Sequence, residues 1–366
     1  MARRKLGTLA AFVVIALALY FTLWPVPIDP VAWTPPPAPD YSGPFARNER
    51  LAAMERLALG PHHGPEAVAV DAAGWIYAST REGRIVRLRP DGSRPEMYAE
   101  TGGAPLGLRV DAAGNLVVAD ALRGLLRIDR DRRVTVLAAE ADGVPIGYAD
   151  DLDVARDGRV YFSDASTKFG ARPWGGSYSA SLLEITEHRG HGRLLVWDPT
   201  TGRATTLARG IHFANGVALA DDESSVLVSE TGSYRVLRYW LTGPRRGAME
   251  PLIENLPGFP DNVTRGLGGR FWVALISPRS RPVDALAGQP FLRKILMRLP
   301  GALLPQPSHY GHVVAFDASG HVVASLQDPS GGYRKISSAL ETSRYLYLGS
   351  LEMPTLGRLA KDRAGL

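Results

Sequence analysis

From residue 66 onward the chain repeats one pattern of hydrophobic and polar positions. In each copy a run of alternating apolar residues leads into a tight polar turn, often Asp-x-x-Gly, and a second apolar run follows. This arrangement is typical of a β-hairpin. The six copies are Glu66 to Thr80, Leu106 to Asp120, Asp151 to Asp164, Asn215 to Glu230, Asn262 to Leu275 and Lys335 to Ser350.

A second hairpin-like segment follows most copies, so that each unit predicts four strands. Four-stranded units with a period of roughly 40–50 residues are typical of propeller blades. We therefore expect an all-β, six-bladed β-propeller over residues 45–366, with insertions at 165–191 and 277–310. The last copy lacks a strand, and we expect one near residues 50–60 to complete it, because an open edge would otherwise be exposed. A pair of β-sandwiches is the alternative, but it gives no reason for six copies.

The N-terminus carries an uncharged apolar run of 19 residues, Leu6 to Trp24. Its length is sufficient for a transmembrane helix, and we interpret it as an uncleaved signal anchor over residues 6–24. A cleaved signal peptide is the alternative. The basic flank at residues 1–5 predicts a cytoplasmic N-terminus, with the rest in the periplasm or another extracytoplasmic space. Residues 25–44 are rich in proline and predict a semi-rigid linker.

Composition narrows the chemistry. The absence of cysteine excludes a disulfide scaffold, a thiolate metal site and a thiol nucleophile. The formal charge is +5, and Arg3, Arg4 and Lys5 supply three of these charges in the flank. The remaining positive charge is too small and too scattered along the chain to indicate nucleic-acid binding, so we predict no nucleic-acid partner.

Polar residues begin the innermost strand in several of the expected blades. These strand starts all point to one end of the central channel, and they bring together Glu66, Asp150, Asn215 and Asp261, with Asn262 next in sequence. Buried carboxylates repel one another unless a cation lies among them. Oxygen donors of this kind suit Ca²⁺, so we expect one ion in the channel. The alternative is that each residue merely caps a turn.

Three segments resemble the strictosidine-synthase-like and adipocyte plasma membrane-associated protein family, which is related to gluconolactonases and paraoxonases. They are Gly210 to Gly243, Pro257 to Leu275 and Leu346 to Leu359. The resemblance implies a six-bladed propeller with a calcium ion held by Glu66, Asn215 and Asp261. Asp150 stands where paraoxonase-like relatives have Asn, which adds negative charge and leaves another divalent metal open.

The same resemblance implies hydrolysis of a small lipophilic ester or lactone, with Asp261 as base or nucleophile. His212 is a second candidate for proton transfer, although a solvated loop histidine is the plainer interpretation. Leu106 and Asp120 replace the paraoxonase histidines, and Arg334 replaces the glutamate of strictosidine synthase. A non-catalytic binding propeller therefore stays open as an alternative, and a condensing enzyme is a weaker one.

The second insertion contains a predicted amphipathic helix between Pro290 and Pro300. Its pattern gathers the apolar residues on one face and the basic residues on the other. Two roles are open: the helix lies on an anionic membrane, or its apolar face packs on the propeller as a lid. The apolar positions are Phe291, Leu292, Ile295, Leu296 and Leu299, and the basic ones are Arg293, Lys294 and Arg298.

Overall fold

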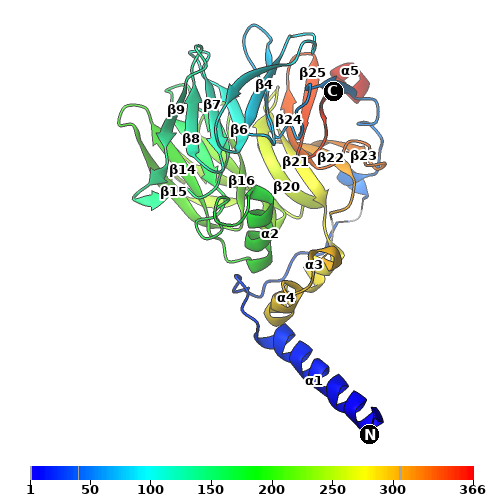
Figure 1. Ribbon diagram of the computed structural model, residues 1–366. Helices are drawn as coiled ribbons and strands as arrows, with labels where there is room; N and C mark the ends of the chain where they lie inside the picture. The colour runs from blue at the N-terminus through cyan, green and yellow to red at the C-terminus, as the bar shows by residue number, and fades with distance from the viewer. Residues whose placement is uncertain (1, 40, 305–306) are drawn as a thin grey trace.

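Six antiparallel four-stranded sheets surround a central channel (Figure 1), which confirms the predicted propeller. The computed structural model describes residues 2–39, 41–304 and 307–366. Within each sheet the strands follow one another in chain order from the channel outward, except in the last blade. That order follows from the repeated hairpins of the sequence.

The strand bounds are as follows. The first blade holds β2 (Val68–Val70), β3 (Ile76–Ser79), β4 (Arg84–Leu88) and β5 (Glu96–Glu100), and the second holds β6 (Pro105–Val110), β7 (Leu116–Asp120), β8 (Gly124–Ile128) and β9 (Val134–Ala138). The third holds β12 (Ala149–Val154), β13 (Val160–Asp164), β14 (Gly192–Asp198) and β15 (Arg203–Ile211), and the fourth holds β16 (Ala214–Leu219), β17 (Ser225–Glu230), β18 (Arg235–Trp240) and β19 (Met249–Ile253). The fifth holds β20 (Gly258–Arg265), β21 (Arg270–Pro278), β22 (Gly311–Asp317) and β23 (Val322–Asp328). A small ribbon of β10 (Glu140–Ala141) and β11 (Val144–Pro145) follows the second blade.

The sixth blade closes the ring with strands from both ends of the chain. It consists of β24 (Ile336–Glu341), β25 (Tyr345–Ser350), β26 (Thr355–Ala360) and β1 (Glu55–Ala58). β1 pairs with β26 in antiparallel register, with Leu57 opposite Leu356. The strand expected near residues 50–60 is therefore present, and it covers an edge that would otherwise lie open.

Buried apolar side chains fill the spaces between neighbouring blades. For example, Val217 and Val228 of the fourth blade share a cluster with Tyr161 and Leu194 of the third. The innermost strands β2, β6, β12, β16, β20 and β24 contact their neighbours in sequence around the channel. Residues at the start of these strands are thereby held at one end of the channel.

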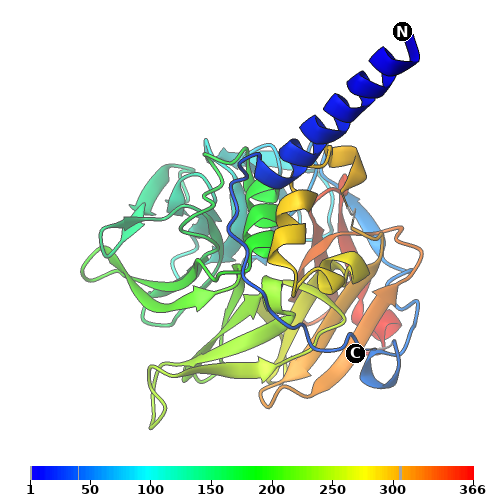
Figure 2. The ribbon, with the colours of Figure 1, turned by 90° about the horizontal axis from the view of Figure 1, so that it is seen from below.

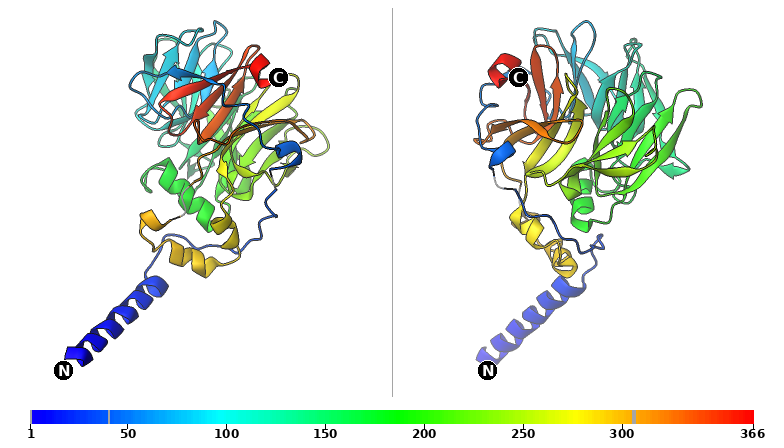
Figure 3. Two further views of the ribbon diagram at one scale, coloured as in Figure 1. Left: turned by 90° about the vertical axis from the view of Figure 1, so that its right-hand side faces the viewer. Right: turned by 180° about the vertical axis from the view of Figure 1, so that it is seen from behind.

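The N-terminal helix α1 (Ala2–Leu23) extends away from the propeller (Figures 1 and 3). Its span Lys5–Leu23 is long and apolar enough to cross a membrane, and none of it is buried against the protein. An exposed apolar surface of this size is unfavourable in water, so the helix is consistent with membrane anchoring.

The two insertions carry most of the other helices. α2 (Ser177–Glu187) lies between β13 and β14, while α3 (Arg281–Ala285), α4 (Pro290–Leu296) and η3 (Gly301–Leu303) lie between β21 and β22. The α-helix predicted for residues 290–300 therefore ends at Leu296, and turns continue the chain beyond it. The remaining short helices are η1 (Gly43–Phe45), η2 (Thr231–Ser233) and α5 (Lys361–Ala364).

The proline-rich linker crosses the same end of the propeller as α2 and α4 (Figure 2). Ile28 is buried, the Asp29 amide donates to Glu187 Oε2 at 2.7 Å, and the Trp33 amide donates to the Ala287 carbonyl at 3.2 Å. The linker is thus docked on the propeller body through buried and hydrogen-bonded residues.

Closure by β1 makes a testable contribution to stability. Leu57→Ala should lower the free energy of unfolding by about 2–5 kcal/mol, because it removes a buried side chain from the closing strand. The control is Met97→Ala on the exposed part of β5, which should change it by about 0.5 kcal/mol or less. Denaturant unfolding of the detergent-solubilised chain measures both. Equal losses of stability in the two variants would show that pairing of β1 with β26 makes no special contribution to the free energy of unfolding.

Candidate metal centre

The predicted site residues lie at irregular points in the strand ladders. The pairing of the innermost strand slips between Ala149 and Leu152 in β12, between Ala214 and Val217 in β16, and between Pro260 and Val263 in β20. Asp150, Asn215 and Asp261 each lie inside one of these slips. A β-bulge bends its strand and redirects a side chain. This local distortion is the structural reason why three neighbouring blades present polar groups to one place.

Hydroxyl groups from adjacent strands hold the backbone around these positions. Ser337 Oγ and Ser338 Oγ both donate to the Glu66 carbonyl, at 2.7 and 2.8 Å. Thr231 Oγ1 donates to the Pro260 carbonyl at 2.7 Å, directly before Asp261. The sixth and fourth blades thereby fix the backbone that carries Glu66 and Asp261.

The structure brings Glu66, Asp150, Asn215 and Asp261 together out of solvent, and each of them is at most 6% exposed. Burial, and then repulsion by Asp261 and Asp150, raises the pKa of Glu66 well above its usual range. Burial and repulsion by Asp261 likewise raise the pKa of Asp150. Burial raises the pKa of Asp261 to about 8, although a hydrogen bond from the Asn215 side chain opposes the shift. The three carboxyl groups therefore share one electrostatic environment.

Several buried oxygen and nitrogen atoms in this cluster have no hydrogen-bond partner: Asn215 Oδ1, Asn262 Oδ1 and Nδ2, and Asp151 Oδ1. An unpaired buried polar atom costs roughly 1–3 kcal/mol, so such a group calls for a ligand. Carboxylate and amide oxygens are the donors that Ca²⁺ prefers. In the described part of the chain no three His, Asp or Glu side chains already have the spacing of a metal site. A cation here would thus depend on the amides as well as the carboxylates.

Asp151 also belongs to the cluster, although its place in the sequence did not mark it as a ligand. It is fully buried, its Oδ2 accepts the Val217 amide at 3.0 Å, and Arg109 Nη1 lies 3.6 Å from its Oδ1. Burial raises the pKa of Asp151 to about 6, against the opposing effect of Arg109. The doubled acid Asp150-Asp151 was the signal in the sequence. Asp151 ties the third blade to the fourth and adds negative charge beneath the candidate ligands.

His212 makes its contacts beside the cluster. Its Nδ1 lies 3.0 Å from Glu230 Oε1, and its ring stacks on the ring of His188 with centroids 4.1 Å apart. Burial would raise the pKa of Glu230, but hydrogen bonds from His212 and Arg235 outweigh it and lower that pKa to about 2. Glu230 is therefore ionised, and as an anion it holds the His212 ring in place. Neither Glu230 nor His188 was singled out from the sequence, because nothing in the local pattern marks them.

Apolar side chains roof the mouth of the channel. Ile28 of the linker packs in one cluster with Leu106, Tyr148 and Phe213, which lie next to the site, and with Leu183 of α2. Leu106 occupies the bulge of β6, so the second blade contributes no oxygen donor from this position. The roof keeps water away from the carboxyl groups and explains why they are so fully buried.

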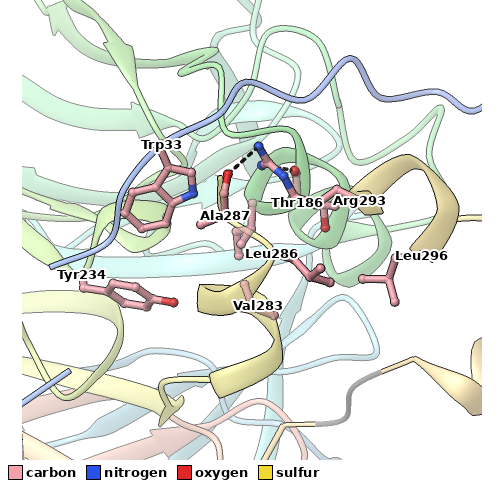
Figure 4. Close-up of a pocket in the computed structure, with 10 residues that line it drawn as sticks. Trp33, Thr186, Tyr234, Val283, Leu286, Ala287, Arg293 and Leu296 are labelled. Carbon is pink, nitrogen blue, oxygen red and sulfur yellow. Dashed lines mark hydrogen bonds between the residues drawn. The ribbon is translucent and has the colours of Figure 1, made fainter. Parts of the chain in front are cut away.

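A small cavity of about 30 Å³ lies within the roof, between the linker, α2, α3 and α4 (Figure 4). Trp33, Tyr234, Leu286 and Leu296 line it, and Arg293 donates across it to the carbonyls of Thr186 and Ala287. It has room for a water molecule but not for a substrate. None of the candidate metal ligands lines this cavity, so it is separate from the candidate metal centre.

The fold and the cluster together define a six-bladed propeller with an acidic channel end. A family model for the strictosidine synthase-like N-terminal region matches residues 43–88, and one for strictosidine synthase matches residues 150–244. The adipocyte plasma membrane-associated protein of Danio rerio is 34% identical, over 98% of this chain and 90% of its own length. Protein strictosidine synthase-like 10 of Arabidopsis thaliana is 35% identical, over 80% of this chain and 84% of its own. The chain belongs to this strictosidine-synthase-like family.

Solved structures share the fold at lower identity. A gluconolactonase from Xanthomonas campestris has a TM-score of 0.59 and 21% identity, covering 85% of this chain and 91% of its own. Regucalcin from Agrobacterium tumefaciens, described as a calcium-binding protein, has a TM-score of 0.59 and 16% identity, covering 84% and 93%. At these identities the likeness establishes the propeller architecture alone.

Crowding of the carboxyl groups predicts a pH-dependent stability. The pKa of Asp261 is about 8 in the folded state, against 3.8 for an ordinary aspartate. At pH values between these two, the folded protein therefore binds more protons than the unfolded chain does. In chelator, stability should therefore fall as the pH rises from about 4 to 8. Asp150→Asn should reduce this loss, because it removes one repelling group. Thermal unfolding in chelator across this range measures both.

The matched control is Asp164→Asn in the same blade. Asp164 is buried but accepts hydrogen bonds from Arg193 Nη2 at 2.6 Å and Nε at 3.0 Å. Removing one partner of a buried ion pair costs about 3–5 kcal/mol, so this variant should be destabilised where Asp150→Asn is not. A loss of stability in Asp150→Asn as large as in Asp164→Asn would contradict the proposed repulsion.

Proposed function

We propose that this chain is a membrane-anchored, calcium-dependent hydrolase of carboxylic esters or lactones. The observation that supports it is the buried cluster of Glu66, Asp150, Asn215 and Asp261, whose charges and unpaired oxygens suit a cation. Asn262 is a further candidate ligand from the bulge of β20. The gluconolactonase and calcium-binding neighbours of the same fold support the same class of reaction. Because Asp150 adds negative charge, the site could hold another divalent metal in place of calcium.

A calcium ion held by Glu66, Asp150, Asn215 and Asp261 would supply Lewis acidity toward the carbonyl oxygen of an ester. The chain's own residues supply the rest of the chemistry. We assign to Asp261 the role of the base that takes a proton from the attacking water. As the water oxygen bonds to the acyl carbon, the ester C–O bond breaks, and the proton passes to the departing alcohol. The apolar roof limits other water and favours lipophilic substrates.

His212 is our candidate for moving protons between the mouth and solvent. Glu230 holds its Nδ1, so exchange falls to Nε2. The side chain is partly exposed, at 27%, as a proton carrier requires. Its hydrogen bonds run to Glu230 and Ser233, and none of those described joins it to Asp261. A carrier role therefore fits His212 better than a role as the primary base.

We propose the orientation from the distribution of charge. Arg3, Arg4 and Lys5 precede the apolar span, which favours a cytoplasmic N-terminus. The propeller then lies in the periplasm or another extracytoplasmic space. The apolar helix and the curated relatives named for membrane association support anchoring.

A non-catalytic, ligand-binding propeller is the second candidate. It is favoured by Leu106 and Asp120, which stand where paraoxonases have histidines. A condensing enzyme is disfavoured, since Arg334 replaces the expected glutamate and pairs with Glu352. The hydrolase and the binding propeller both require a bound cation, but only the hydrolase requires turnover of a substrate.

Turnover of aryl esters or lactones by the full chain should disappear in chelator and return with added Ca²⁺. Asp261→Asn should lower kcat by about 10²-fold or more, because the group acts in proton transfer, and its melting temperature in chelator should not fall, because the change removes one repelling carboxyl group. The control is Asp131→Asn, in an exposed turn, which should leave both unchanged. Stabilisation by Ca²⁺ without turnover over a broad ester and lactone panel would favour the binding propeller instead.

A further inference from the structure

The α4 segment is attached to the end of the membrane helix. Tyr20 Oη donates to the Arg298 carbonyl at 3.0 Å, and Arg298 donates in return to the carbonyls of Trp24 at 2.7 Å and Phe21 at 2.9 Å. Figures 1 and 3 show α4 next to the end of α1. If α1 crosses a bilayer, these bonds place the α4 segment at the surface where the chain leaves it.

Two of the three basic side chains of this segment, Arg293 and Arg298, are buried in the protein, contrary to the amphipathic pattern. Arg293 is buried and donates to the carbonyls of Thr186 at 2.7 Å, Ala287 at 3.1 Å and Val31. Lys294 Nζ pairs with Asp29 Oδ1 at 3.1 Å. Together with Arg298 these cations bind α2, the linker and α1 to one another. Arg293 and Arg298 are therefore not available to lipid headgroups, and the partly exposed Lys294 is paired with Asp29.

Two apolar residues of α4 and one of η3 are exposed, whereas Leu296 lines the cavity. Phe291 is 55% exposed, Leu292 is 42% exposed, and Leu303 of η3 is 66% exposed. Figure 2 shows η3 beside the same end of α1. Leu296 lines the cavity, as expected of a lid, whereas Phe291 and Leu292 are left uncovered. Large apolar side chains gathered at a membrane-proximal surface indicate contact with lipid.

We propose that Phe291, Leu292 and Leu303 form an insertion surface that enters the acyl region of the bilayer crossed by α1. The occupant is lipid, because the insertion surface continues the apolar surface of α1 across the Arg298 hydrogen bonds. Since Arg293 and Arg298 are buried and Lys294 is paired with Asp29, insertion does not depend on anionic lipid. The inference concerns docking and stands apart from the proposed hydrolase activity. Its structural consequence is that the roofed end of the propeller faces the membrane.

The absence of cysteine from the chain allows a direct test on the full-length protein in lipid vesicles. Leu292→Cys and, separately, Val323→Cys are labelled with an environment-sensitive fluorophore. Val323 is the control, since it is 54% exposed but lies on β23 of the propeller. Brominated acyl chains should quench the Leu292 label several times more strongly than the Val323 label. Quenching should be equal in phosphatidylcholine vesicles and in vesicles that contain phosphatidylserine.

A second variant tests whether the apolar side chains themselves drive insertion. With the fluorophore on Leu303→Cys, the added change Phe291→Asp should reduce quenching, whereas Val323→Asp should not. Three results would overturn the proposal: equal quenching of the Leu292 and Val323 labels, quenching that requires phosphatidylserine, or shielding of the Leu292 label that depends on protein concentration and not on brominated lipid. The last result would assign the surface to a second copy of the chain.

Discussion

Three carboxyl groups from three blades share one buried volume at the end of the channel, and their repulsion is the constraint on which the rest depends. Burial raises the pKa of Glu66, Asp150 and Asp261, and neighbouring carboxylates raise each pKa further. Asp261 and Asp150 act on Glu66, Asp261 acts on Asp150, and Asp151 acts on Asp261. Such a cluster is unfavourable for the protein alone. A closed ring makes it possible, because strands locked on both sides cannot move apart to relieve the repulsion.

The ring, the bulges and the roof serve this cluster in different ways. The bulges of β12, β16 and β20 direct the side chains inward, and the hydroxyls of Ser337, Ser338 and Thr231 hold the backbone behind them. The linker and the insertions then exclude solvent from the same end. Arg293 and Arg298 join these segments to the base of α1. The apolar residues that cover the carboxyl cluster are thus connected by hydrogen bonds to the end of the membrane helix.

The sequence predicted the repeated blades well, but it did not predict how the linker and the insertions pack on them. Periodic hairpins predicted six blades and the closing strand, because local patterns decide pairing. Strand starts predicted Glu66, Asp150, Asn215 and Asp261 at one end, since blade symmetry places them there. The direction of α4 was not predictable, because the partners of Arg293 are backbone carbonyls distant in sequence. Docking of the linker through Ile28 and the pairing of His212 with Glu230 depend on similar long-range contacts.

Binding of calcium to the purified full-length chain tests the central claim most directly. Equilibrium dialysis with radioactive calcium should show one ion per chain, and Glu66→Gln and Asn215→Ala should each weaken its binding strongly, whereas Asp131→Asn should not. Absence of stoichiometric calcium, or binding that both variants retain unchanged, would contradict the account.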